Sequence, residues 1–158
     1  MEALDELSAK QACAEVLARY ALAVNTRDVD GFVRLFTPDG EWNRPGGHSM
    51  RGHDEIRAFI DHALPDPTEA TLRHVNGAAV IDIAGADTAT SWSQTTVYET
   101  PRGGDLPVPL TGPDMVVEYR DRLVRRHHGW LIARRDTTVV FAARGIPQPP
   151  SPPPPPGS

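Results

Sequence analysis

The sequence lacks most of the residues and spacings that mark the commonest catalytic sites. Cys13 is its single cysteine, which excludes an intramolecular disulfide and a cysteine-based metal site. The six histidines show neither HxxxH nor HExxH spacing, so we expect no metal ion. The segment "GHSMR" has Arg51 where a nucleophile elbow requires its second glycine. These absences argue against metal-dependent chemistry and against a serine or cysteine nucleophile.

Long apolar runs are also missing. No stretch of 18 apolar residues occurs, so no membrane-spanning helix is expected. The first residues, "MEALDELSAKQACAEV", are acidic and have no basic region followed by an apolar run, which is unlike a signal peptide and suggests a cytoplasmic protein. The net charge of −5 argues against nucleic acid and anionic membranes as partners.

The length and the distribution of proline predict one domain with a tail. A chain of 158 residues is most simply a single domain, which we place at residues 1–145. Half of the sixteen prolines fall in "IPQPPSPPPPPGS", residues 146–158. This composition predicts an extended polyproline-II or disordered tail, which serves either as a spacer or as a ligand for an SH3-like partner.

The N-terminal part has the hydrophobic period of helices. From Cys13 to Val24 the apolar residues follow one helical face, after Ser8 as a possible N-cap. Tyr20 belongs to this buried face, and Asn25 lies close to it at the end of the helix. A second, short helix is expected after Asp28 as its N-cap, and a third over residues 53–64.

Between these helices two segments have turn signals. "TPDG", residues 37–40, predicts a turn, and "EWNRPGGHSMRG", residues 41–52, predicts a short hairpin around its proline and glycines. From Thr71 onward the period changes to two. Four strand-like runs follow, at residues 71–85, 88–100, 114–128 and 130–143. Helices first and a long antiparallel meander afterwards predict an α+β fold.

Several of these segments together resemble a known family. They are "ARYALAVNTRDVDGFVRLFTPDGEW", "MRGHDEIRAFI", "RHVNGAAVIDIAGADTAT" and "EYRDRLVRRHHGWLIARR". Their order and spacing resemble the SnoaL-like branch of the nuclear transport factor 2-like superfamily over residues 8–142. The resemblance implies a cone in which a bent antiparallel sheet wraps around about three helices and encloses an apolar pocket. It also implies that no cofactor is used and that the protein forms a homodimer or homotrimer.

That superfamily includes scytalone dehydratase, dehydrochlorinases, ketosteroid isomerase, polyketide cyclases, epoxide hydrolases and proteins without activity, so the fold does not decide the function. In its dehydratases and dehydrochlorinases, a histidine of the first long strand pairs with an aspartate at the end of the first helix. His74 matches that histidine, whereas Asn25 stands in the place of the aspartate. Asn43 stands where ketosteroid isomerase has its aspartate base. Tyr20 and Arg135 match polar residues of the cavity.

The resemblance therefore predicts acid/base chemistry, with His74 moving a proton and Asn25 orienting its ring. Tyr20 and Arg135 would hold a developing oxyanion or the leaving group. Arg134 replaces Arg135 as the inward residue if the strand register differs. The other side chains expected to bind the substrate, mostly aromatic, are Trp42, Asn43, Trp92, Tyr98, Tyr119, Asp121 and Phe141.

We accordingly predict a cofactor-independent lyase or isomerase, similar to a dehydratase or cyclase, that acts on a hydrophobic cyclic small molecule. One alternative is a non-catalytic binding or assembly module, because Asn25 and Asn43 both lack the carboxylate of the family. The other alternative is an epoxide hydrolase or cyclase that uses Asp121 and Arg135. The deciding geometry is whether Asn25 Oδ1 contacts a ring nitrogen of His74 beside an open cavity.

Overall fold

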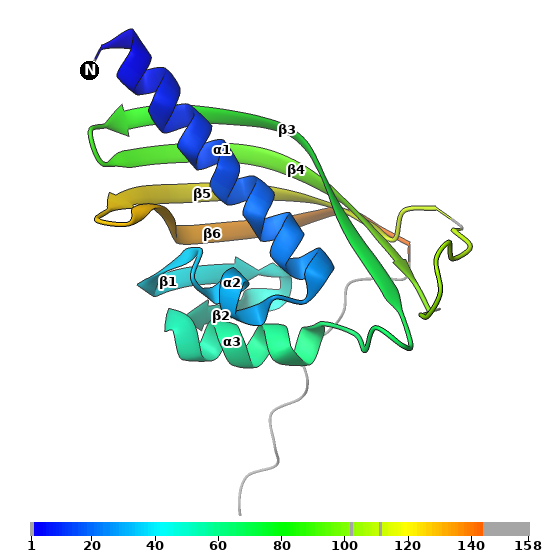
Figure 1. Ribbon diagram of the computed structural model, residues 1–158. Coiled ribbons are helices and arrows are strands. Elements are labelled where there is room, and N and C mark those ends of the chain that lie inside the picture. The colour runs from blue at the N-terminus through cyan, green and yellow to red at the C-terminus, as the bar shows by residue number, and fades with distance from the viewer. Residues whose placement is uncertain (1, 102, 111, 144–158) are drawn as a thin grey trace, which may run out of the picture.

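Three helices pack against a six-stranded mixed sheet (Figure 1) in the computed structural model, which describes residues 2–101, 103–110 and 112–143. The helices are α1 (Ala3–Thr26), α2 (Val29–Val33) and α3 (Gly52–Ala63), with a 3-10 turn η1 (Pro45–Gly47). The strands are β1 (Phe36–Arg44), β2 (His48–Arg51), β3 (Thr71–Gly85), β4 (Thr88–Thr100), β5 (Met115–Arg126) and β6 (Gly129–Ala142). The sheet has the order β2-β1-β6-β5-β4-β3. The predicted α+β fold is confirmed.

The first helix is longer than its apolar face indicates. It begins at Ala3 instead of after Ser8, and its first turns expose Leu4 and Leu7 to solvent. These turns lie beyond the sheet, so no buried stripe marks them in the sequence. The predicted cap of the second helix is confirmed, since Gly31 N donates to Asp28 Oδ1 over 2.8 Å.

Strand β1 contains a segment whose predicted structure is wrong. The residues of "TPDG" lie within β1 and do not form a turn. β1 runs parallel to β6, and the register between the two strands shifts between Phe36 and Glu41. This irregularity accommodates the proline and glycine of the segment without reversing the chain. The hairpin predicted over residues 41–52 is present as β1, η1 and β2, and it turns at Gly46 and Gly47, whose φ angles are 82° and 78°.

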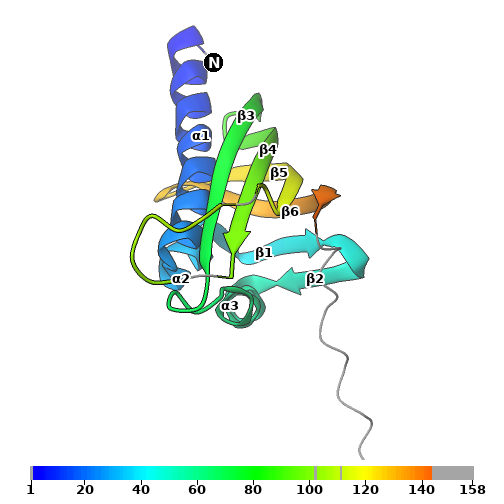
Figure 2. The same ribbon diagram turned by 90° about the vertical axis from the view of Figure 1, so that its right-hand side faces the viewer.

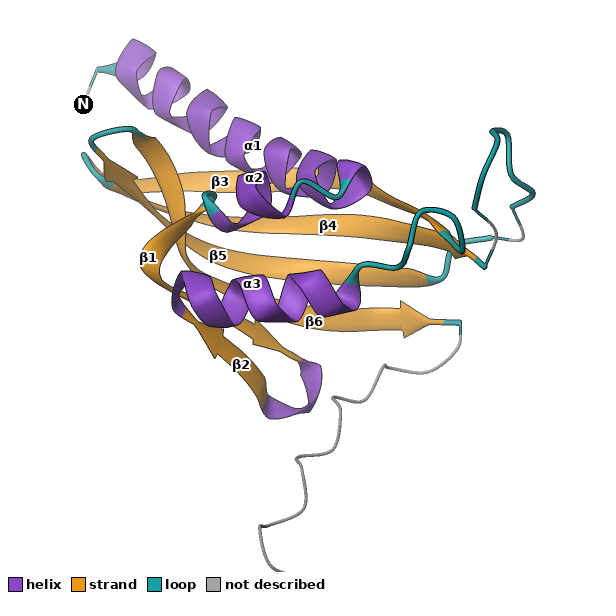
Figure 3. Ribbon diagram, turned by 60° about the horizontal axis from the view of Figure 1, so that its bottom comes forward, coloured by secondary structure: helices purple, strands orange, loops and turns teal. Residues whose placement is uncertain are grey.

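The four long strands β3 to β6 form the predicted antiparallel meander. Helix α1 crosses one face of these strands (Figure 2), and α3 packs against β1 and β2 (Figure 3). The core lies between the helices and this face of the sheet, around Tyr20, Phe32, Trp42 and Tyr119. The proline-rich tail predicted over residues 146–158 lies outside the described residues. None of the described helices has both the length and the apolar character that crossing a membrane requires.

Candidate active site

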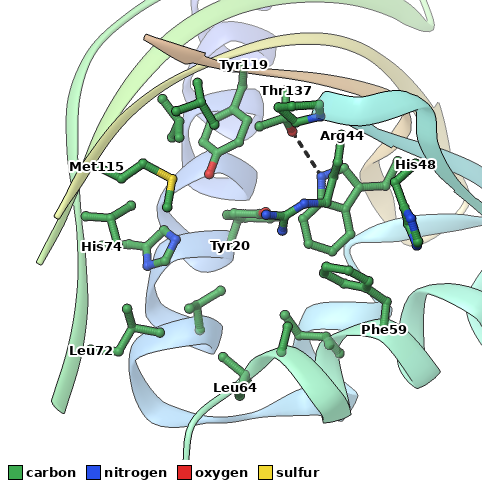
Figure 4. A pocket seen from close by; sticks show the side chains of 18 of the residues that line it. Tyr20, Arg44, His48, Phe59, Leu64, Leu72, His74, Met115, Tyr119 and Thr137 are labelled. Atoms are coloured by element: carbon green, nitrogen blue, oxygen red, sulfur yellow. Dashed lines mark hydrogen bonds between the residues drawn. The ribbon is translucent and has the colours of Figure 1, made fainter. Parts of the chain in front are cut away.

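A partly enclosed cavity of about 340 Å³ lies between α1, α3 and the helix-covered face of the sheet (Figure 4). This volume is typical of a small-molecule pocket. Four of the site residues predicted from the sequence line it: Tyr20, Trp42, His74 and Tyr119. Apolar side chains cover most of the remaining wall, among them Phe59, Leu64, Leu72, Val97, Met115 and Val139. The cavity is therefore suited to a hydrophobic molecule that carries a few polar atoms.

His74 projects into this cavity from β3 (Figure 4). Its Nδ1 is buried and has no hydrogen-bond partner among the described residues. Burial, together with the nearby positive charges of Arg44 and Arg135, lowers the pKa of the imidazole to about 4. The ring is therefore neutral at neutral pH, and any cation that forms on it is strongly disfavoured.

Asn25 contacts the backbone of His74, which differs from the expected contact with the ring. The backbone N–H of His74 donates to Asn25 Oδ1 over 2.6 Å, and Asn25 Nδ2 donates to the carbonyl oxygen of His74 over 3.0 Å. The reason is that β3 is an edge strand, whose outward backbone groups have no neighbouring strand. Asn25 supplies the missing donor and acceptor, as a backbone would, and thereby positions His74 without touching its ring.

Replacing Asn25 by aspartate is expected to destabilise the protein. A carboxylate still accepts from the His74 N–H, but it loses the donor to the carbonyl oxygen and repels that oxygen. We expect the N25D free energy of unfolding to fall by about 1–3 kcal/mol in urea titrations at pH 7.5. The matched control is Q11E, the same amide-to-carboxylate change at an exposed position of α1. Equal unfolding midpoints for N25D and Q11E would contradict this role.

Arg135 and Asp121 form an ion pair behind the tyrosines of the pocket. Arg135 Nε and Nη2 donate to Asp121 Oδ1 and Oδ2 over 2.7 and 2.8 Å, and Ser91 Oγ donates to the same carboxylate. The guanidinium carbon lies 4.0 Å from the ring centroid of Tyr20 and 4.1 Å from that of Tyr119. Arg135, which is 1% exposed, does not line the cavity that contains His74, so it is not placed to hold an oxyanion there as predicted.

Burial and charge shift the pKa values within this cluster. Burial alone lowers the pKa of the Arg135 guanidinium, but the Asp121 carboxylate outweighs that effect and raises it above its ordinary value. Burial, with a contribution from Tyr20, raises the pKa of the Tyr119 hydroxyl well above its ordinary value. Tyr119 is therefore protonated at neutral pH, and its hydroxyl points into the cavity (Figure 4).

The other predicted substrate-binding residues lie away from the cavity. Asn43, next to Trp42 in β1, points the opposite way, donates to Asp136 and accepts from Ser49. Trp92 and Tyr98 also lie on the other face of the sheet, because neighbouring residues of a strand alternate and Val97 faces the cavity. Phe141 is 68% exposed, since the register of β5 and β6 shifts just before it.

The sequence analysis missed Arg44, which lines the cavity. Its guanidinium carbon lies 5.2 Å from the Trp42 ring centroid and 4.8 Å from that of Phe59. In Figure 4 this group reaches into the cavity beside Tyr20. Strand alternation could have revealed it, because Arg44 follows Trp42 by two residues and so shares its face.

Comparisons with known proteins match both the sequence and the fold. The SnoaL-like domain model matches residues 5–136. A protein of unknown function from Mycobacterium tuberculosis is 27% identical, with a TM-score of 0.72 over 91% of this chain and 79% of that chain. An NTF2-like protein from Novosphingobium aromaticivorans is 26% identical, with a TM-score of 0.70 over 85% and 83%.

A hexachlorocyclohexane dehydrochlorinase of type 2 is similar in fold, with 14% identity and a TM-score of 0.72 over 94% of this chain and 98% of that chain. None of the curated proteins matches the sequence.

Proposed function

The chain belongs to the SnoaL-like domain family, and on that premise we propose that it is a cofactor-independent lyase or isomerase. Its substrate would be a hydrophobic cyclic molecule with an acidic C–H bond, bound in the cavity between α1, α3 and the sheet. His74 would remove the proton, and the hydroxyls of Tyr20 and Tyr119 would donate hydrogen bonds to the oxygen on which charge develops. The family match, together with the dehydrochlorinases of similar fold, supports a catalytic or ligand-binding role.

The observation that carries this proposal is the imidazole of His74, which projects into a largely apolar cavity beside Arg44, Tyr20 and Tyr119. The positive charge of the nearby arginines, which disfavours an imidazolium there, favours an oxyanion beside it. An enolate that forms in the transition state is thus stabilised more than the neutral ketone, which is the requirement for catalysis. His74 is a weak base, and its use fits a substrate whose proton is already acidic.

The second candidate is a binding protein without catalysis. This candidate is favoured by the ring of His74, because its Nδ1 has no hydrogen-bond partner among the described residues. No described group therefore selects the tautomer that a general base requires. Epoxide hydrolysis is less well supported, because Asp121 is buried and paired with Arg135 outside the cavity that contains His74.

Hydrogen exchange of a probe ketone separates these two candidates. 2-Tetralone is a bicyclic ketone with acidic C–H bonds next to its carbonyl, and NMR follows their replacement by deuterium from D₂O. We expect wild type to accelerate this exchange and H74Q to lose about 10²-fold in rate, the lower end of the range for a general base because the base is weak. The matched control is H128Q, at the exposed turn between β5 and β6.

Two results would count against catalysis by His74. Exchange in wild type no faster than in buffer would favour the binding protein, provided that 2-tetralone binds. Equal rates for wild type and H74Q would remove His74 from the mechanism.

A further inference from the structure

We propose that Arg44 binds a carboxylate of the ligand, so that the natural substrate class is cyclic carboxylic acids in their anionic form. This inference rests on the proposed function, since it names the substrate class of the same cavity. It assigns the charged end of the ligand to β1, opposite the wall that carries His74.

The guanidinium of Arg44 is held in place by two aromatic rings. It lies over Trp42 and Phe59, at 5.2 and 4.8 Å from their ring centroids. The Trp42 ring is itself fixed, because its Nε1 donates to Thr137 Oγ1 over 3.1 Å and its edge packs against Phe59. Stacking on rings orients the planar fork of an arginine without using its N–H donors.

Those donors have no partner in the part of the chain that the structure describes. Neither a hydrogen bond nor an ion pair joins Arg44 to any described residue, whereas Arg134 and Arg135 both pair with carboxylates. Glu99, the only carboxylate among the described lining residues of the cavity, forms no ion pair with Arg44. A half-buried arginine with free donors is matched by a ligand carboxylate, which accepts two of its N–H groups at once.

The remainder of the cavity fits a ring attached to that carboxylate. Tyr20 and Tyr119 lie between Arg44 and His74, and apolar side chains of α3 and β3 close the opposite side (Figure 4). Arg44 is the one arginine or lysine among the described lining residues, so the ligand carboxylate would pair with Arg44. A molecule with the carboxylate at Arg44 would extend its rings past the tyrosines toward His74.

Binding measurements with two probes of one shape test the inference. 2-Naphthoate and 2-naphthamide share a bicyclic ring, and they differ in charge. By isothermal titration calorimetry at pH 7.5, we expect wild type to bind 2-naphthoate at least about tenfold more tightly than 2-naphthamide, the effect of charged hydrogen bonds. The R44M variant is expected to lose this preference. R51M, which removes the same charge from an exposed position of β2, is expected to keep it.

The outcomes separate this inference from the proposed function. Equal affinity of wild type for the two probes would overturn the role of Arg44, and so would an R44M variant that keeps the preference. Because wild type alone gives the first comparison, an unstable R44M variant would not hide the result. A protein that prefers 2-naphthoate but does not accelerate exchange of 2-tetralone would retain the carboxylate site and lose the catalytic role. A protein that accelerates exchange of 2-tetralone but binds the two probes equally would retain the catalytic role and lose the carboxylate site.

Discussion

Replacing Asp121 by alanine is expected to lower the free energy of unfolding by about 3–5 kcal/mol, the usual cost of removing one partner from a buried ion pair. The Asp121 side chain is fully buried, and it accepts both bonds from Arg135 and one from Ser91. Its loss leaves the guanidinium of Arg135 without a counter-ion between two tyrosine rings. Urea unfolding at pH 7.5 measures the change.

The double variant D121A/R135M shows whether the cost comes from the uncompensated charge. Methionine fills much of the arginine volume without a charge, so we expect the double variant to recover most of the loss. The control is E15Q in the exposed Glu15–Arg19 pair of α1, for which a change of less than about 1 kcal/mol is expected. A D121A variant as stable as E15Q, or a double variant less stable than D121A, would contradict the role assigned to this pair.

Acidification is expected to destabilise the protein through His74 in particular. The pKa of His74 is about 4 in the folded protein and about 6.5 in the unfolded chain. Between these pH values the unfolded state binds the proton and the folded state does not, so stability is lost as the pH falls. The loss that His74 causes should reach about 2 kcal/mol at pH 5 and about 3 kcal/mol once the pH is below 4.

Comparison with H74Q isolates this contribution from the carboxylates that titrate in the same range. Between pH 7.5 and pH 5, the unfolding free energy of wild type should fall by about 2 kcal/mol more than that of H74Q. The H128Q variant, changed at an exposed turn, should follow wild type. A constant difference between wild type and H74Q over this range would mean that His74 is not desolvated as described.

Local patterns in the sequence determined most of the architecture. The apolar stripe of α1, the Asp28 cap and the period of two after Thr71 each depend on contacts between near neighbours, and all of them appear in the structure. Strand alternation also places Trp42 and Arg44 on one face of β1 and Asn43 on the other, which is the arrangement in the structure. The segment "TPDG" has the local signal of a turn but forms a strand, because its pairing partner, β6, lies about ninety residues further along the chain.

The site depended on two features that only the tertiary structure decided. A register shift in β6, where Ala133 is the extra residue, turns Arg135 inward and leaves Arg134 outside. The position of β3 at the edge of the sheet turns the amide of Asn25 toward the backbone of His74. Residue types and spacing define which groups are available, but a bulge or a free strand edge arises from pairing between distant segments. For that reason the sequence by itself predicted the fold and the pocket residues Tyr20, Trp42, His74 and Tyr119, whereas the hydrogen-bond partners of Asn25 and Arg135 and the ring contacts of Arg44 followed from the folded chain.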